Sequence, residues 1–256
     1  NRFAIYTLGC KLNFSESSYI SDLLSQGGFI LSDTPDYILI NSCAVTASAE
    51  KKVRHLVAQL SRKNPDAEII LLGCYTELSP DFFKNFKGVK HIFGSADKIN
   101  VVSFLLHNKQ LSTPYFFPSY SLHDRTRSFL KIQDGCDYHC SYCTVATARG
   151  ESRSDTIENV LKNIEKIAEE EIKEIILTGV NLGDFGRKNG TSFFQLLKAI
   201  KKQNIIPRLR ISSIEPNLLT HDIIELSTHS ERIMPHFHIP LQSGSDRILA
   251  LMKRRY

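Results

Sequence analysis

Three cysteines stand close together near the middle of the chain, as Cys136, Cys140 and Cys143. The stretch before them, from Phe129, is apolar and β-prone, and it ends at Asp134-Gly135, a pair typical of turns. A loop leaving a strand can bring such thiolates around one corner of a metal cluster. Cysteine thiolates are the usual ligands of iron–sulfur clusters. Three of them leave one iron of a four-iron cluster open, and an open iron can bind and activate a small molecule.

Zinc and disulfides are the two alternative uses of these cysteines. Zinc accepts thiolates, and the nearby His139 could serve as a fourth ligand, but structural zinc sites usually pair two separated knuckles. Disulfides are disfavoured, because three neighbouring cysteines cannot all pair and nothing in the sequence indicates secretion. The spacing favours an iron–sulfur cluster over zinc.

The other three cysteines, Cys10, Cys43 and Cys74, are far apart in the sequence, but each follows a predicted strand. These strands are expected at residues 3–6, 37–40 and 69–72. The carboxyl ends of the strands of an open α/β sheet form a common crevice, so the three thiols can converge there. The pattern favours a second cluster held by these cysteines. The alternative is three small buried apolar side chains, since free cysteine is often buried.

Strand and helix patterns alternate through residues 1–107, which we interpret as one domain with a doubly wound parallel sheet. Ser15 is the expected cap of the first helix, which runs to the glycines at 27–28. The remaining elements are expected at residues 48–62 and 99–106 for helices and at 91–93 for a shorter strand.

The second half, residues 128–256, contains four further strand and helix units, which predict a partial parallel (β/α) barrel. Residues 108–127 have prolines and no clear periodicity, and we interpret them as a linker. Ser154 or Asp155 is the expected cap of the first helix of the barrel. Strands are expected at 129–132, 174–178, 208–211 and 237–239, and helices at 156–170, 193–201, 218–226 and from about 245.

Polar side chains gather where the predicted barrel strands end, which is the rim on which barrel enzymes build their sites. Each of them could instead be a turn former or a helix-entry residue. As a set on the side of the cysteine loop, they favour cofactor contacts. These residues are Asn181, Ser212, Ser213, Glu215, Gln242 and Ser243.

The composition is that of a globular protein without a membrane span, and we expect a cytoplasmic location. Lys and Arg exceed Asp and Glu by 32 − 27 = 5, an excess compatible with RNA but weak as an argument. The chain begins at Asn1 without a methionine and stops at Tyr256 after a basic helical stretch. We therefore expect a fragment of a longer protein.

Seven motifs in order along the chain resemble those of the radical S-adenosylmethionine (SAM) methylthiotransferases. The motifs are TLGCKLN (7–13), NSCAVT (41–46), LLGCYTE (71–77), CDYHCSYCTVATARG (136–150), TGVNLGDFG (178–186), RLRISSIEP (208–216) and HFHIPLQSGSDRIL (236–249). The resemblance implies SAM and two 4Fe–4S clusters as cofactors. It also implies a radical SAM barrel, here apparently truncated at the C-terminus and without the family's small RNA-binding barrel.

By this resemblance, the two groups of cysteines have different roles. Cys136, Cys140 and Cys143 would hold the cluster that binds and cleaves SAM, and Cys10, Cys43 and Cys74 would hold an auxiliary cluster that presents or supplies sulfur. Tyr142 and Gly179 would join the polar rim in binding the cofactor. Arg149 and Arg153 would meet RNA phosphate or the modified base. The reaction would also need an electron donor such as flavodoxin or ferredoxin, and a sulfur source.

The TGVNLG stretch resembles the branch of the family that adds a methylthio group to C2 of N6-threonylcarbamoyladenosine at position 37 of tRNA. Sister branches act on isopentenyladenosine in tRNA or on a ribosomal protein, and both stay open as alternatives. A non-catalytic iron–sulfur or zinc module that binds RNA is an alternative of a different class. VATARG at 145–150 replaces the family's more usual VPYARG, so a proline and an aromatic residue are missing there.

Overall fold

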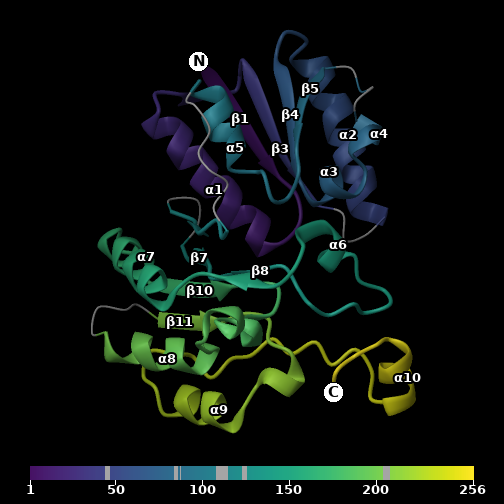
Figure 1. Ribbon diagram of the computed structural model, residues 1–256. Helices are drawn as coiled ribbons and strands as arrows, with labels where there is room; N and C mark the ends of the chain where they lie inside the picture. Colours follow the sequence, from purple (N-terminus) through teal and green to yellow (C-terminus); the bar gives the residue numbers. More distant parts are fainter. Residues whose placement is uncertain (44–46, 84–85, 87, 108–114, 123–125, 204–207) are drawn as a thin grey trace. The chain divides into compact units, whose positions relative to one another are not determined.

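The computed structural model describes the chain except residues 44–46, 84–85, 87, 108–114, 123–125 and 204–207 (Figure 1). The chain forms two compact units. Unit 1 is Asn1–Pro114 with Thr147–Arg149, and unit 2 is Tyr115–Ala146 with Gly150–Tyr256. The change of unit falls in the expected linker, part of which lies outside the described residues.

The sheet of unit 1 has five parallel strands in the order β2-β1-β3-β4-β5. Its central strands β3 and β4 are continuous apolar runs because helices cover both faces of the sheet. The doubly wound architecture predicted from the alternating pattern is therefore confirmed. The strands are β1 (Arg2–Thr7), β2 (Ile30–Leu31), β3 (Tyr37–Ser42), β4 (Glu68–Gly73) and β5 (Val89–Phe93).

Helices α1 (Lys11–Gln26) and α5 (Asn100–Leu105) cover one face of this sheet (Figure 1). The other face is covered by α2 (Ala47–Lys63), α3 (Cys74–Leu78) and α4 (Pro80–Phe83). The predicted cap of α1 was wrong. Cys10 is the cap residue, and Ser15 lies inside the helix, where its hydroxyl donates to the Leu12 carbonyl at 3.0 Å.

The sheet of unit 2 has the order β11-β10-β7-β6, with β7, β10 and β11 parallel and β6 antiparallel. Its strands are β6 (Ser119–Tyr120), β7 (Ser128–Lys131), β10 (Glu174–Thr178) and β11 (Arg208–Ile211), and β8 (Gln133–Asp134) pairs with β9 (Arg153–Ser154) as a separate two-stranded sheet. The strand predicted at 237–239 was wrong. That segment meets the end of β11 only through the isolated bridge of Ser213 with His238. Pro235 and Pro240 flank it and remove donors that a strand would need.

Helices pack on one face of the unit 2 sheet around an apolar core that includes Leu130, Ile175 and Leu209. Thr156 caps the first helix by accepting a hydrogen bond from the Asn159 N–H, so the cap predicted at Ser154 or Asp155 was wrong. The helix predicted at 218–226 begins later, because the segment after β11 first forms a 3-10 turn at Pro216–Leu218. The helices are α7 (Ile157–Glu169), α8 (Phe193–Lys202), α9 (His221–Thr228) and α10 (Asp246–Leu251), and α6 (Val145–Arg149) follows the cysteine loop.

The sheet face opposite these helices carries charged side chains, as the inside of a partial barrel does. Glu174 is 3% exposed and pairs with Arg210 at 3.0 Å, Arg208 at 3.1 Å and Arg127 at 3.3 Å. Among the described residues, no helix is both long and apolar enough to cross a membrane.

Candidate metal centres and cofactor site

The loop that carries Cys136, Cys140 and Cys143 starts with a turn that only glycine permits. Gly135 has a φ of +68°, and a Cβ added to it would overlap the carbonyl oxygen of Glu151. One residue later, the Cys136 N–H donates to the Gly150 carbonyl at 3.0 Å. The two ends of the loop are thereby held together.

Gln133, which is fully buried, joins this loop to the loop after β10. Its Nε2 donates to the carbonyls of Asp134 at 3.0 Å and Gly135 at 2.8 Å. Its Oε1 accepts from the Asn181 N–H at 2.9 Å. The sequence analysis did not single out Gln133, although a polar residue at the end of an apolar strand was a signal for such a role.

Two of the three sulfur atoms of this loop accept hydrogen bonds in buried or partly buried positions. Arg254 Nη1 donates to Cys140 Sγ at 3.2 Å, and the Tyr138 N–H donates to Cys136 Sγ at 3.4 Å. Burial is the main cause that raises the pKa of the Cys136 thiol to about 11. A bound metal supplies the positive charge that makes a buried thiolate stable, so this set of three sulfur donors fits an iron–sulfur cluster.

Zinc and an iron–sulfur cluster require different arrangements of the cysteines in this loop. No three His, Cys, Asp or Glu side chains among the described residues are grouped so that they could hold a metal ion. His139, the fourth ligand considered for zinc, is exposed. In a four-iron cluster each thiolate binds a different iron atom, so the three sulfur atoms need not lie as close together as around a single metal ion.

The segments that carry Cys10, Cys43 and Cys74 lie at neighbouring strand ends of unit 1. β1 pairs with β3, and β3 pairs with β4, up to the register Ser42 with Gly73. A Cβ added to Gly9 would lie 2.7 Å from Cys43 Sγ. Cys10 is exposed, whereas Cys43 and Cys74 are buried. The parallel topology therefore brings together three segments that the sequence separates by about thirty residues each.

The rim of unit 2 contains buried polar atoms that, among the described residues, have no hydrogen-bond partner. They are the Nδ2 atom of Asn181 and the hydroxyl of Ser212. Asn181 and Ser212 are 2% and 5% exposed. Because buried polar groups are normally satisfied, such atoms indicate a place for a polar ligand. SAM carries ammonium, carboxylate and hydroxyl groups that fit this set.

Asp184 is a site residue that the sequence analysis missed, although it lies in the TGVNLGDFG motif. It is 3% exposed, and burial raises its pKa. Arg187 lies 3.6 Å from one carboxylate oxygen, beyond normal hydrogen-bond length. The charge of Asp184 contributes to the raised pKa of Cys136, so the carboxylate lies near the cysteine loop.

Glu215, another predicted rim residue, is bound by Arg254, which the sequence analysis also missed. Arg254 donates to the Glu215 carboxylate and to the hydroxyl of Tyr142 at 3.3 Å. Burial raises the pKa of Glu215, while the charge of Arg254 opposes that shift. Glu215, Tyr142 and Cys140 are thus gathered around one guanidinium.

The other predicted cofactor residues differ in their contacts: Ser213 and Gly179 lie against neighbouring side chains, whereas Gln242 is exposed. Ser213 bonds His238 Nδ1 at 2.8 Å, and an added Cβ at Gly179 would lie 2.9 Å from Gln133 Oε1. Gln242 is exposed and has a φ of +62°. The structure brings Asn181 and Glu215 together, since the Glu215 N–H donates to Asn181 Oδ1 at 3.3 Å.

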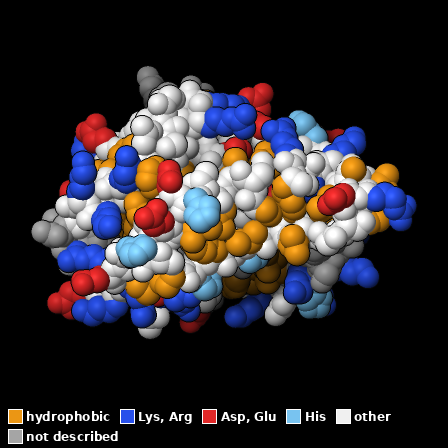
Figure 2. Space-filling view, turned by 90° about the horizontal axis from the view of Figure 1, so that it is seen from below, with side chains coloured by type: hydrophobic (Ala, Val, Ile, Leu, Met, Phe, Trp, Pro, Cys, Tyr) orange, Lys and Arg blue, Asp and Glu red, His pale blue; other side chains and the backbone are white. Residues whose placement is uncertain are grey.

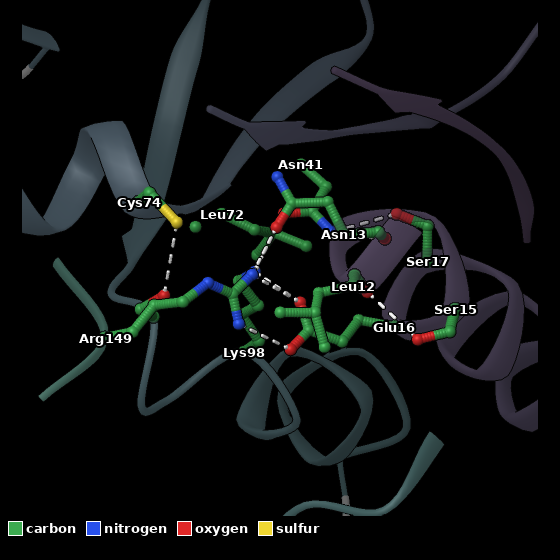
Figure 3. A network of polar contacts seen from close by, with 12 residues as sticks. Leu12, Asn13, Ser15, Glu16, Ser17, Asn41, Leu72, Cys74, Lys98 and Arg149 are labelled. Atoms are coloured by element: carbon green, nitrogen blue, oxygen red, sulfur yellow. Dashed lines mark hydrogen bonds and ion pairs between the residues drawn. The ribbon is translucent and has the colours of Figure 1, made fainter. Parts of the chain in front are cut away.

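Neither arginine expected to meet RNA has a freely exposed side chain. Arg149 is buried in unit 1, where it donates to Asn13 Oδ1 at 2.6 Å and pairs with Glu16 at 3.2 Å (Figure 3). The buried carboxylate of Glu16 draws the guanidinium inside, and the predicted contact of Arg149 with RNA stays a prediction. Arg153 is 18% exposed and pairs with Asp134 at 3.2 Å.

Comparisons with known proteins match both halves of the chain. The model described as "Uncharacterized protein family UPF0004" matches residues 2–94, and that of the Radical SAM superfamily matches residues 130–256. A threonylcarbamoyladenosine tRNA methylthiotransferase MtaB of Thermotoga maritima is 40% identical over 98% of this chain and 61% of its own length. The Bacillus subtilis protein of the same name is 35% identical over 99% and 60%. The chain belongs to the radical SAM methylthiotransferase family.

The chain spans about 60% of the length of these curated relatives. A relative from Thermodesulfovibrio yellowstonii, named tRNA-2-methylthio-N(6)-dimethylallyladenosine synthase, is 31% identical over 98% of this chain and 62% of its own length. Membership of the radical SAM superfamily implies SAM and a 4Fe–4S cluster as cofactors.

Solved structures support the fold. The radical SAM methyltransferase TsrM of Kitasatospora setae aligns with a TM-score of 0.66 at 10% identity, over 97% of this chain and 60% of that one. The cobalamin-dependent radical SAM enzyme OxsB aligns with a TM-score of 0.61 at 12% identity, over 100% and 46%. An α/β fold with a partial radical SAM barrel is thereby confirmed.

Proposed function

We propose that the full-length protein adds a methylthio group to C2 of N6-threonylcarbamoyladenosine at position 37 of tRNA. The two relatives described above, which are 40% and 35% identical to this chain, are named for methylthiolation of this nucleoside and support the proposal. The TGVNLG stretch, which follows β10, is the feature of this chain that favours that branch.

The observation that carries an enzymatic function is the set of unsatisfied polar atoms beside the cysteine loop. A module that only bound RNA through a metal would have no need for a buried amide and a buried hydroxyl without partners on the described rim, beside the buried carboxylate of Asp184. We assign these atoms of Asn181, Ser212 and Asp184 to the polar groups of SAM. Gln133 orients Asn181 by accepting from its backbone N–H.

The two cysteine groups take different roles in this proposal. When bound at Cys136, Cys140 and Cys143, a 4Fe–4S cluster supplies the electron that cleaves SAM and thereby starts hydrogen abstraction from the adenine. The segments of Cys10, Cys43 and Cys74 hold a second cluster that takes part in sulfur delivery. The protein's own contribution is to bind and orient the reactants and to keep water away from them.

The proposed partners are tRNA, an electron donor such as flavodoxin or ferredoxin, and a sulfur source, all of which belong to a cytoplasmic setting. The net charge of +5 is compatible with tRNA. On the face seen in Figure 2, Lys and Arg side chains alternate with Asp and Glu and with apolar groups. That face has no continuous basic patch, so we do not propose it as the tRNA surface.

Nucleoside mass spectrometry tests the proposed substrate. tRNA from cells that lack the gene is compared with tRNA from cells in which the full-length gene is restored. Loss and recovery of the methylthiolated threonylcarbamoyl nucleoside support the proposal. Loss of the methylthio group from isopentenyladenosine would contradict it and favour the activity in the name of the Thermodesulfovibrio yellowstonii relative.

A further inference from the structure

Three residues of helix α6 belong to unit 1, although the chain before and after them belongs to unit 2. Ala148 is 4% exposed and packs in the apolar core of unit 1 that also contains Cys74. Arg149 is 6% exposed. This short segment, Thr147–Arg149, follows the loop of Cys136, Cys140 and Cys143 directly in the chain. It is therefore a covalent connection between that loop and the unit that carries the other three cysteines.

Arg149 donates a hydrogen bond to Asn13, and the side chain of Asn13 in turn bonds two cysteine segments of unit 1. Asn13 Nδ2 donates to the carbonyls of Leu8 and Ser42, each at 2.9 Å. Leu8 lies two residues before Cys10, and Ser42 lies directly before Cys43. One amide group therefore joins the ends of β1 and β3, just before Cys10 and Cys43.

The other end of the Asn13 amide is held by cations. Its Oδ1 accepts from Arg149 Nη2 at 2.6 Å and from Lys98 Nζ at 3.1 Å, as Figure 3 shows. Two charged donors on the oxygen determine which way the amide points, since an amide presents donors at one end and an acceptor at the other. Without them, the amide loses the interaction that keeps its NH₂ group on the two carbonyls.

Glu16 makes this arrangement possible inside the protein. Its carboxylate pairs with Lys98 at 2.6 Å and with Arg149 at 3.2 Å, and the three side chains are 1%, 1% and 4% exposed. Buried charges persist only when they are paired and hydrogen-bonded. The guanidinium is thus drawn inside by Glu16 and is directed by the same contact onto Asn13.

We propose that Arg149 is a positioning residue for the auxiliary cysteine site, acting through Asn13 on the spacing of the Cys10 and Cys43 segments. The segment of Cys74 serves for comparison, because it is bonded to the Ser42 hydroxyl, which donates to the Leu72 carbonyl and accepts from the Tyr75 N–H, rather than to the Asn13 amide. Figure 3 also draws a contact between the Cys74 sulfur and Arg149, so Asn13→Asp is the cleaner variant for this comparison. The inference rests on the proposed function for the identity of the ligand, a 4Fe–4S cluster. The effect of Arg149 on the spacing of the Cys10 and Cys43 segments is expected in the metal-free chain as well.

Native-state alkylation of the metal-free full chain with iodoacetamide, read for each cysteine by mass spectrometry, tests the proposal. Arg149→Met and Asn13→Asp should each raise the alkylation rate of Cys43 by about fivefold and that of Cys74 by much less, because the opening is local. Asn13→Asp keeps an acceptor for the cations and replaces the amide donors with a carboxylate oxygen that faces the two carbonyls. Arg149→Lys should be intermediate, since lysine keeps the charge but not the paired geometry.

Leu24→Ala is the matched control, since Leu24 is fully buried in the same helix as Asn13 and Glu16. It should lower the unfolding midpoint and raise the rates of Cys43 and Cys74 together. If Arg149→Met and Asn13→Asp both raise the alkylation rates of Cys43 and Cys74 equally, or raise neither rate, the proposal is overturned. If Arg149→Met does not fold, Asn13→Asp and Arg149→Lys carry the comparison.

Iron binding separates this inference from the proposed function. With Cys136, Cys140 and Cys143 all replaced by Ala, any reconstituted iron belongs to the auxiliary site, and Arg149→Met should remove most of it. If that triple variant binds no iron even with Arg149 present, the proposed second cluster fails. The alkylation result decides the role of Arg149 in either case.

Discussion

Arg254 donates a hydrogen bond to the sulfur of Cys140 at 3.2 Å. Its guanidinium also pairs with Glu215, and the two side chains are 4% and 12% exposed. A cation beside a cysteine lowers the free energy of the thiolate relative to the thiol, and the thiolate is the form that binds metal. The contact therefore connects a residue near the end of the described chain with metal binding by the cysteine loop.

Replacing Arg254 by Met should weaken the cluster at this loop. Hydrogen bonds to charged groups contribute about 1.5–3 kcal/mol, so a chelator should extract iron about tenfold faster or more. The measurement is the loss of cluster absorbance in the reconstituted full chain. Arg255→Met is the control, because Arg255 stacks on Tyr138 at 4.2 Å and bonds the Asp137 carbonyl instead of a sulfur. Equal rates in the two variants would contradict a role for the Arg254 contact with sulfur.

Replacing Cys136, Cys140 and Cys143 together by Ala should remove about half of the bound iron and abolish SAM cleavage. The reason is that this loop supplies all the thiolates of the proposed SAM-binding cluster. Iron and sulfide analysis and detection of 5′-deoxyadenosine provide the measurements. Retained SAM cleavage would show that the cysteine assignment is wrong.

Replacing Cys43 by Ala should separate the two proposed clusters. Reductive SAM cleavage should stay near the parent rate, whereas formation of the methylthio nucleoside should stop, because the two activities depend on different cysteines. Both products are measured in one anaerobic reaction with tRNA and the full-length protein. Equal loss of both activities in a folded variant would indicate a structural role for Cys43.

Gly135→Ala should disrupt the cysteine loop far more than Gly190→Ala. Both glycines have positive φ, +68° and +70°, so both variants pay a backbone strain of about 1–2 kcal/mol. At position 135 the added methyl group overlaps the backbone carbonyl of Glu151. At position 190 no atom lies within 4 Å of the added methyl group. Urea unfolding and iron content are the measurements, and similar losses in the two variants would contradict the close approach.

Glu174 should make stability depend on pH in the acid range. Burial alone would raise its pKa, but hydrogen bonds and charges from Arg210, Arg127 and Arg208 lower it below the ordinary value of 4.5. A lowered carboxyl pKa means that the stabilisation is present above about pH 4.5 and is lost as the pH falls through the folded-state value. Glu174→Gln should cost about 1–3 kcal/mol at pH 7 and flatten the acid limb of the stability curve.

Glu158→Gln is the control for this pH dependence. Glu158 is exposed and pairs with Lys162 one helical turn away, so solvent screens the interaction. Its replacement should leave the acid limb almost unchanged. An acid limb that Glu174→Gln leaves as steep as in the parent would show that other carboxyl groups govern it.

Local patterns in the sequence were sufficient for the sheet of unit 1 and for most of unit 2. Continuous apolar runs such as 37–40 and 69–72 predict strands buried on both faces, and the strands appear there as β3 and β4. The strand predicted at 237–239 failed, because its hydrogen bonds depend on the neighbouring strand and on two flanking prolines more than on its own apolar residues.

The amino-acid sequence by itself determined the features on which the predicted chemistry depends: the six cysteines, the strands they follow and the motifs that resemble the family. Only the tertiary structure decided which polar side chains hold those cysteines in place. Arg149 and Asn13 are 136 residues apart and meet through a hydrogen bond. Such contacts depend on strand order and on the pairing of buried charges, which no local pattern encodes. For that reason no pattern in the sequence predicted that the folded chain buries Arg149 beside Glu16.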